Sequence, residues 1–306
     1  MTLVAVTSKS FSKNVFLRER LLRCFPNTKF NDEAISFDDH GLIAFLDNIE
    51  RAIIGLESIN EKVLSALPKL SIISKYGVGT DALDMNALQR HGVELRCTPG
   101  VNKRSVAELV VAQMISVLRH LYVSNADVKN GVWQVRKSHQ LSSRTIGVVG
   151  LGNIGQDLIS LLSVFGCRII GNDVANRRAF AASNHVELMS LEALLKTADI
   201  VTLHTPLTPS TSRLINHETL ALMKADSILI NYARGGIVDQ NAVVEALKQK
   251  TLGAAVFDVF EEEPPFNKNL ITHPRVFASG HIGGSSFEAI RAMGLAAIDG
   301  LSNSRS

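Results

Sequence analysis

One segment of the chain, TIGVVGLGNIG at residues 145–155, joins a β-branched strand to three glycines spaced as G-x-G-x-x-G. Gly150, Gly152 and Gly155 are followed by a helical pattern that ends at Gly166. In a strand–turn–helix unit the first glycine permits a tight turn, the second lets the backbone approach a pyrophosphate, and the third lets the helix pack on the strand. The segment therefore predicts a doubly wound α/β domain that binds a dinucleotide at a helix N-terminus.

An acidic residue follows the next predicted strand, where this fold contacts the ribose of a dinucleotide. That strand begins at Arg168 and Asp173 ends it, 18 residues beyond Gly155. The Asp173 carboxylate predicts hydrogen bonds to the ribose hydroxyls and repulsion of the 2′-phosphate of NADP, so NAD is the expected coenzyme. Arg177 and Arg178 lie close behind and leave NADP open, although such arginines more often face solvent. A glycine-rich turn without a ligand is the competing interpretation, and Asp173 disfavours it.

Length and composition set limits on the rest of the chain. At about 150 residues per domain, 306 residues predict two domains. The 46% hydrophobic and 20% charged residues are typical of a folded globular protein. The net charge is only +3, with no block of five or six like charges, which indicates no nucleic-acid or anionic-membrane surface.

The sequence also bears on the location of the protein. The longest apolar stretches, such as Val106–Leu118, fall short of the about 20 residues of a membrane-spanning helix. The first residues lack the basic and apolar regions of a signal peptide. Cys24, Cys97 and Cys167 form no C-x-x-C pair, which indicates neither a disulfide framework nor a metal site. We therefore expect a cytoplasmic protein that binds no metal.

Short apolar runs alternate with helical stretches along the chain, which predicts parallel sheets joined by crossover helices. The expected strands are residues 3–6, 52–54, 72–73 and 93–95 in the first part, and 145–149, 168–171, 200–203, 227–230, 253–257 and 276–278 in the second. The six strands of the second part are the number that a doubly wound dinucleotide fold requires.

A break in this pattern predicts a domain boundary. After Thr98–Gly100, Ser105 and Glu108 form a capping box before a long apolar helix that runs to about Leu121. We expect a dinucleotide-binding domain of residues 99–281 inserted into a domain formed by residues 1–98 and 282–306. The helical pattern 287–301 is expected to pack back on the first part.

Five more segments complete a pattern that covers nearly the whole chain: YGVGTDALD at 76–84, NKRSVAE at 102–108, NYARGGIVD at 231–239, FDVFEEEP at 257–264 and GHIGGSS at 280–286. In order and spacing they resemble the D-isomer-specific 2-hydroxyacid dehydrogenase family, which includes D-3-phosphoglycerate dehydrogenases. The resemblance implies two doubly wound parallel-sheet domains, a Rossmann NAD-binding domain inserted into a flavodoxin-like substrate domain. It also implies hydride transfer between a D-2-hydroxy acid and NAD, and a homodimer formed through the nucleotide domains.

By this resemblance Arg234, Glu263 and His281 are the expected catalytic residues. The Arg234 guanidinium would bind the substrate carboxylate through two parallel hydrogen bonds. His281 would give a proton to the carbonyl oxygen during reduction and take one from the hydroxyl during oxidation, and Glu263 would orient its imidazole. An arginine that closes a turn and an acidic loop at 261–263 are the plainer interpretations.

The same resemblance assigns the remaining contacts. The expected coenzyme-binding residues are Gly150, Gly152, Asn153, Ile154, Gly155, Asp173, His204, Thr205, Pro206, Tyr232, Ala233, Arg234, Asp258, His281, Gly283 and Gly284. The expected substrate-binding residues are Lys75, Val78, Gly79, Asn102, Arg234 and His281. The N–H groups of Val78 and Gly79 would form a carboxylate cradle, and a plain tight turn is the competing explanation. His204 is equally consistent with a histidine satisfied at a strand end.

One departure from the family concerns the substrate. Phosphoglycerate-specific relatives carry an arginine after the strand that ends near Ile54, where this chain has Gly55–Glu57. A distal phosphate has no obvious partner there, although Lys75 and Arg104 are candidates to contact one. The chain also lacks the C-terminal regulatory domain of long phosphoglycerate dehydrogenases, so control by serine through that module is not expected.

Two alternatives to this function stay open. A glyoxylate/hydroxypyruvate-type reductase with loose specificity is the enzymatic one, and an NAD(H)-sensing corepressor or scaffold is the non-catalytic one. The presence of Arg234, Glu263 and His281 together disfavours the second, because a sensor needs no such trio. The identity of the 2-hydroxy acid, the presence of a phosphate on it and the physiological direction stay open.

Overall fold

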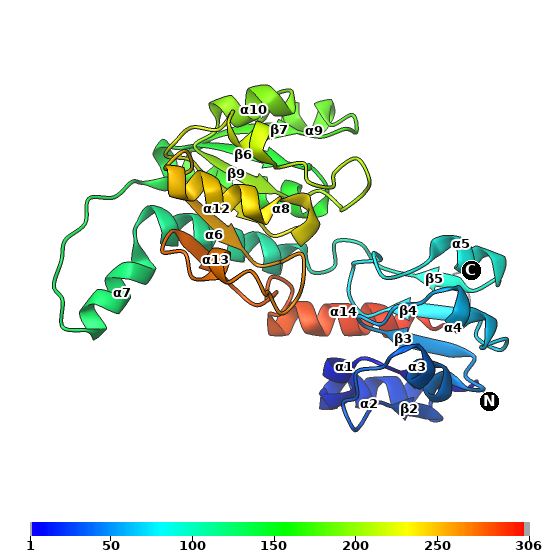
Figure 1. Cartoon of the computed structure of the whole chain (residues 1–306). Helices are drawn as coiled ribbons and strands as arrows, with labels where there is room; N and C mark the ends of the chain where they lie inside the picture. The colour runs from blue at the N-terminus through cyan, green and yellow to red at the C-terminus, as the bar shows by residue number, and fades with distance from the viewer. Residues whose placement is uncertain (1, 303–306) are drawn as a thin grey trace. The chain divides into compact units, whose positions relative to one another are not determined.

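The computed structural model describes residues 2–302 and divides them into two compact units. One unit contains residues 2–102 and 286–302, and the other contains residues 103–285. Each has its own parallel sheet, of five and seven strands respectively, and its own hydrophobic core. Figure 1 shows the elements of both units, coloured along the chain. We refer to them as the five-stranded unit and the seven-stranded unit.

The five-stranded unit has the strand order β2-β1-β3-β4-β5. Its strands are β1 (Val4–Val6), β2 (Thr28–Phe30), β3 (Arg51–Ile54), β4 (Ile72–Lys75) and β5 (Glu94–Arg96). Its helices are α1 (Lys9–Lys13), α2 (Val15–Cys24), α3 (Asp39–Leu46), α4 (Glu61–Ser65), α5 (Met85–Arg90) and α14 (Phe287–Gly300). This is the flavodoxin-like order, so the fold class expected for this part of the chain is confirmed.

Helices cover both faces of this sheet. Successive residues of a strand point to opposite faces, so a strand can contribute side chains to both cores. Ala52 and Ile54 face a core completed by α3, α4 and α5, whereas Ile53 faces a core completed by α2 and α14. Ala297 and Ile298 of α14 belong to that second core. The last described helix therefore packs on the first part of the chain, as expected from its sequence.

The seven-stranded unit has the strand order β12-β11-β10-β9-β6-β7-β8. Its strands are β6 (Thr145–Val149), β7 (Arg168–Asn172), β8 (Glu187–Leu188), β9 (Ile200–Leu203), β10 (Ile228–Asn231), β11 (Ala254–Phe257) and β12 (Val276–Ala278). Its α-helices are α6 (Lys103–Leu118), α7 (Leu121–Lys129), α8 (Asn153–Leu162), α9 (Arg178–Ser183), α10 (Leu191–Thr197), α11 (His217–Leu220), α12 (Gln240–Gln249) and α13 (Lys268–Ile271). Three short 3-10 helices are η1 (Leu141–Ser143), η2 (Ser163–Phe165) and η3 (Gly235–Ile237). The order is that of a Rossmann fold with one more edge strand, β12.

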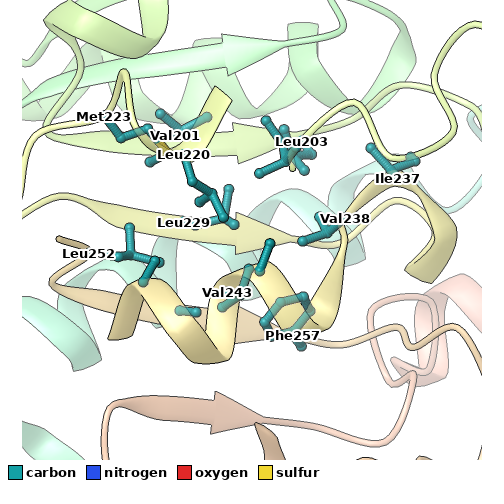
Figure 2. Close-up of a cluster of buried hydrophobic side chains, with 14 of the residues drawn as sticks. Val201, Leu203, Leu220, Met223, Leu229, Ile237, Val238, Val243, Leu252 and Phe257 are labelled. Atoms are coloured by element: carbon teal, nitrogen blue, oxygen red, sulfur yellow. The ribbon is translucent and has the colours of Figure 1, made fainter. Parts of the chain in front are cut away.

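The central strands β9, β10 and β11 of this sheet are buried on both faces. Leu229 and Phe257 face a core that α10, α11 and α12 complete, and Figure 2 shows these side chains packed against Val243 of α12. Ile230 and Val256 face the opposite core, which α6 and α8 complete. Such burial on both sides explains why these strands are nearly continuous apolar runs in the sequence.

Three expectations from the sequence were incomplete or wrong. The edge strands β2 and β8 were not predicted, because they are only three and two residues long and contain no buried residue. The capping box was wrong: α6 begins at Lys103, so Ser105 lies inside the helix. Its hydroxyl donates to the carbonyl oxygen of Gly283 at 2.6 Å. A tertiary hydrogen bond therefore takes the place of the local cap.

No single helix among residues 2–302 has both the length and the hydropathy needed to cross a membrane. Taken jointly, α6 and α7 have that length and composition, but they are bent by 63° at the break between them.

Candidate active site

The glycine-rich turn lies at the carboxyl end of β6, beside the point where the strand order reverses. Gly150 has a φ of +94°, and a Cβ there would lie 2.6 Å from the carbonyl oxygen of His204. At Gly155 a Cβ would lie 2.1 Å from the carbonyl oxygen of Gly150. A Cβ at Gly152 would meet no atom within 4 Å. Packing therefore requires glycine at positions 150 and 155. Gly152 leaves open the space in front of α8.

The N-terminus of α8 is equipped to bind an anion. Gly152 is its N-cap, and no side chain caps the helix. The N–H groups of Asn153 and Ile154, in the first turn, lie at the positive end of the helix dipole. This arrangement fits the pyrophosphate of NAD, which is the ligand that the sequence predicts here.

Asp173 ties the glycine-rich turn to the end of β7. Its Oδ2 accepts a 2.7 Å hydrogen bond from the N–H of Leu151, and its Oδ1 accepts one of 2.7 Å from the N–H of Ala175. The Nε of Arg177 lies 3.3 Å from Oδ2. The carboxylate therefore holds the turn in place, and a cation sits beside it where the sequence predicts the ribose.

His204 follows β9 and is held as a neutral ring. Its Nε2 lies 2.9 Å from the hydroxyl of Thr202. Its Nδ1 is buried without a hydrogen-bond partner among residues 2–302. Burial lowers the pKa of His204 to about 3. The backbone of His204 packs against Gly150, and the half-exposed Thr205 and exposed Pro206 continue along the same edge.

Glu263 and His281 form a hydrogen-bonded pair. Oε2 of Glu263 lies 2.7 Å from Nδ1 of His281, and Oε1 accepts a 3.1 Å bond from the N–H of Phe260. The two side chains are 40% and 48% exposed, respectively. Nε2 of His281 has no partner among the described residues, so this nitrogen can exchange a proton with a bound molecule.

Arg234 lies just after β10, at the carboxyl edge of the sheet. It is half-buried and precedes η3. One guanidinium nitrogen donates to the carbonyl oxygen of Ala233 at 2.7 Å, and the side chain of Asn231 donates to the carbonyl oxygen of Arg234 at 2.9 Å. These bonds fix the turn that carries the guanidinium.

Gly235 brings this turn against the segment that carries Glu263. A Cβ at Gly235 would lie 1.9 Å from the carbonyl carbon of Phe260, so the two backbones are in direct contact. Since the N–H of Phe260 donates to Glu263, and Glu263 bonds to His281, the three predicted catalytic residues lie on connected segments. Sequence reasoning had not singled out Gly235, although the doubled glycine after Arg234 was a signal that could have found it.

The other residues predicted near the nicotinamide lie in the same region. Tyr232 and Ala233 are buried at the end of β10, and Asp258 is buried after β11. The carboxylate of Asp258 accepts the N–H of Gly283 at 2.7 Å, and the half-buried Gly284 follows.

In the five-stranded unit, the turn after β4 presents free backbone donors. Gly77 has a φ of +121°, and the N–H groups of Val78 and Gly79 have no acceptor among residues 2–302. Oδ1 of Asn102, in the same unit, is buried without a hydrogen-bond partner among the same residues. These groups fit the predicted carboxylate cradle.

The two cations considered for a distal phosphate have partners within the protein. Lys75 is 7% exposed, and its ammonium group donates to the carbonyl oxygen of Gly55. The guanidinium of Arg104 pairs with Asp157 of α8 at 2.9 Å. Oε2 of Glu57 accepts the N–H of Gly55 at 2.6 Å, which places a carboxylate after β3.

In the described part of the chain, no group of three or more His, Cys, Asp or Glu side chains could hold a metal ion.

Comparisons with known proteins show which proteins this chain resembles. Residues 111–283 match the model of the D-isomer specific 2-hydroxyacid dehydrogenase, NAD binding domain. The D-3-phosphoglycerate dehydrogenase of Methanocaldococcus jannaschii is 40% identical over 239 residues, which are 77% of this chain and 46% of that protein. The hydroxypyruvate reductase of Thermotoga maritima is 35% identical over 246 residues, which are 79% of each chain.

Among solved structures, that of the pyruvate reductase of Chlamydomonas reinhardtii superposes with a TM-score of 0.84 at 27% sequence identity. It covers 97% of this chain and 95% of the other. The chain spans about half the length of the phosphoglycerate dehydrogenases that it matches.

Proposed function

Because the chain belongs to the D-isomer specific 2-hydroxyacid dehydrogenase family, we propose that it is an NAD-dependent oxidoreductase acting on a D-2-hydroxy acid. The observation that carries this proposal is the 2.7 Å hydrogen bond between Glu263 and His281. An imidazole that is hydrogen-bonded to a carboxylate, near the turn that carries Arg234, can transfer a proton to or from a bound hydroxy or keto acid.

Each member of the trio has a distinct task. Nε2 of His281 donates a proton to the carbonyl oxygen during reduction and takes it back during oxidation. Glu263 holds Nδ1, so the ring keeps one orientation and the imidazolium is stabilised when it forms. The planar guanidinium of Arg234 binds the substrate carboxylate through two parallel bonds and polarises the adjacent carbonyl.

The coenzyme is held by the glycine-rich turn. The open space at Gly152 and the uncapped start of α8 receive the pyrophosphate, and Asp173 receives the ribose hydroxyls. When bound, NAD supplies the hydride acceptor of the reaction. The guanidinium of Arg177 is already paired with Asp173 near the expected ribose site. This ion pair supports NAD as the main coenzyme and NADP as the weaker ligand.

For the substrate we favour an unphosphorylated 2-keto acid, which corresponds to a glyoxylate/hydroxypyruvate-type reductase, over 3-phosphoglycerate. Lys75 and Arg104 have partners within the protein, and Glu57 lies after β3, where phosphoglycerate-specific relatives carry arginine. A carboxylate in that position repels a distal phosphate.

We also propose a homodimer formed through the seven-stranded unit. No residue of α7 is buried. Seven large apolar side chains in residues 121–135 are more than a third exposed: Leu121, Tyr122, Val123, Val128, Val132, Trp133 and Val135. An apolar surface of this extent on one segment is typical of a protein contact, and a second copy of the chain is the partner that we propose. The free thiols of Cys24, Cys97 and Cys167 support a cytoplasmic location.

A panel of 2-keto acids with and without a distal phosphate, assayed with NADH and NADPH, tests these assignments together. We expect turnover with NADH and unphosphorylated keto acids. Tight NADH binding without turnover of any member would favour the NAD(H)-sensing alternative instead. Preference for the phosphorylated acids would identify a phosphoglycerate dehydrogenase.

A further inference from the structure

Helices α2 and α14 of the five-stranded unit pack closely against each other. A Cβ at Gly294 of α14 would lie 2.4 Å from both methyl carbons of Leu17 in α2. Leu17 and Leu21 lie four residues apart on one face of α2 and are fully buried in the core. The other faces of the two helices are exposed to solvent beside each other, and a groove runs between them.

This groove, which we call the α2–α14 groove, has a volume of about 300 Å³. The side chains that line it are Phe16, Glu19, Arg20 and Arg23 of α2 and Arg291 and Leu295 of α14. Residues three, four and seven positions after Phe16, like residues four positions apart in α14, share one face of a helix. Three guanidinium groups and one carboxylate leave the groove with a net charge of +2.

The arginines of the groove have no partner for their charge, whereas most arginines of the protein have one. Arg18, for example, pairs with Asp32. Among residues 2–302, five arginine side chains make neither a hydrogen bond nor an ion pair: Arg20, Arg23, Arg178, Arg213 and Arg291. Three of these five line the same groove. The helix dipole accounts for Arg23, in the last turn of α2, but it does not account for Arg291 in α14.

One of these guanidinium groups is held over an aromatic ring. The guanidinium carbon of Arg291 lies 4.3 Å from the centre of the Phe16 ring. This cation–π contact connects the two walls of the groove and leaves the N–H groups of Arg291 without an acceptor among the described residues. A planar group with five donors in a fixed position is suited to binding the oxygens of an anion.

We propose that the α2–α14 groove binds a small phosphate monoester with an aromatic or apolar organic part. The guanidinium groups of Arg20, Arg23 and Arg291 bind the phosphate, whose charge of about −2 matches that of the groove. Phe16 and Leu295 contact the organic part. None of these residues is assigned to the reaction or to the coenzyme above, so this site is independent of the proposed function.

The size of the groove favours a small molecule over a macromolecule. Its volume lies at the lower end of the range of small-molecule sites. The chain has no block of five or six like charges that would extend the groove into a surface for nucleic acid or an anionic membrane. The positive charge is therefore confined to the space that one small anion occupies.

Phenyl phosphate, a phosphate monoester on one aromatic ring, is the probe that tests this site. We would titrate it calorimetrically into the full chain in the presence of saturating NADH, so that the expected coenzyme site is filled. The Kd should rise by about tenfold or more in Arg20→Gln and in Arg291→Gln, because each variant loses charge-assisted hydrogen bonds. Glu19→Gln should lower the Kd, since it removes the carboxylate that repels the phosphate.

Arg213→Gln is the matched control, because it removes an equally unpaired arginine from the seven-stranded unit. It should leave the Kd of phenyl phosphate unchanged. Inorganic phosphate tests the contribution of the organic part and should bind more weakly than phenyl phosphate. Phe16→Ala should reduce this difference, because the ring that contacts the organic part is lost.

Hydrogen exchange locates the bound probe without any need for turnover. Because the phosphate contacts both helices, amide exchange should slow in α2 and in α14 when phenyl phosphate is added. Absence of binding, an unchanged Kd in both groove arginine variants, or an equal rise in Arg213→Gln would overturn the proposed site. Slower exchange confined to the glycine-rich turn at residues 150–155 would overturn it as well.

Discussion

Nδ1 of His281 lies 2.7 Å from Oε2 of Glu263, although 18 residues separate them in the sequence. The other carboxylate oxygen of Glu263 is held by the N–H of Phe260. Glu263 is thus fixed at both oxygens, and the imidazole is fixed at one nitrogen. The remaining nitrogen, Nε2, is the atom that can exchange a proton with a substrate.

Replacing His281 with alanine should reduce kcat by about 100- to 10,000-fold, since the proton donor of the reaction is lost. The Kd of NADH should stay unchanged, because the glycine-rich turn is untouched. Steady-state kinetics and fluorescence titration check both parts. Wild-type turnover in this variant would remove His281 from the mechanism.

The variant Glu263→Gln keeps a hydrogen-bond acceptor beside His281 but removes the negative charge. We expect kcat at neutral pH to fall by about 10- to 100-fold. Glu262→Gln, one residue away and exposed, is the control. Equal effects of the two substitutions would show that Glu263 has no special relation to His281.

Local sequence signals predicted the central strands well, and for a physical reason. β6 and β9 have the bounds expected from the sequence, because buried parallel strands are uninterrupted β-branched or apolar runs. The edge strands β2 and β8 were missed, since a half-exposed strand needs no such run. Ser105 was misread as a helix cap, because its true partner, Gly283, is 178 residues away.

The site shows the same division between local and long-range signals. Gly155 could be read from a motif because its steric demand is local, since a Cβ there would meet the carbonyl oxygen of Gly150. The partners of Lys75 and Asp258 could not, because they depend on which strands become neighbours in the sheet. Only resemblance to a family selected Glu263 over Glu261 and Glu262, since three adjacent glutamates differ only in their tertiary partners.

The glycines of the turn should respond to substitution in opposite ways. Gly152→Ala adds a methyl group in open space, so the free energy of unfolding should change by less than about 1 kcal/mol. The Kd of NADH should rise by about tenfold or more, a loss of about 1.4 kcal/mol in binding. Gly155→Ala meets the backbone of Gly150 and should lower the free energy of unfolding by about 1–3 kcal/mol. Urea unfolding and fluorescence titration measure the two effects, and unaltered NADH binding by Gly152→Ala would place the pyrophosphate elsewhere.

The exposed apolar side chains of residues 121–135 should hold two copies of the chain together. Trp133 and Val135 are 85% and 89% exposed. Replacing both with serine should convert a dimer into a monomer in sedimentation velocity runs, because a protein contact depends on a few buried aromatic and apolar anchors. Val164→Ser, at a side chain that is 84% exposed in the same unit, should leave the mass unchanged. A wild-type protein that sediments as a monomer would contradict the proposed dimer.

His204 should make the stability of the protein depend on pH. Burial lowers its pKa from 6.5 to about 3 in the folded protein, so above pH 6.5 the ring is neutral in both states and contributes no pH dependence. Between these values the unfolded chain binds a proton that the folded protein does not, so stability is lost as the pH falls, by at most about 1.4 kcal/mol per pH unit. Below about pH 3 the loss is complete. In His204→Gln this contribution disappears. From pH 7.5 to pH 4, the free energy of unfolding should therefore fall more in the wild type than in the variant. An equal fall in both proteins would show that His204 is protonated as readily in the folded protein as in the unfolded chain.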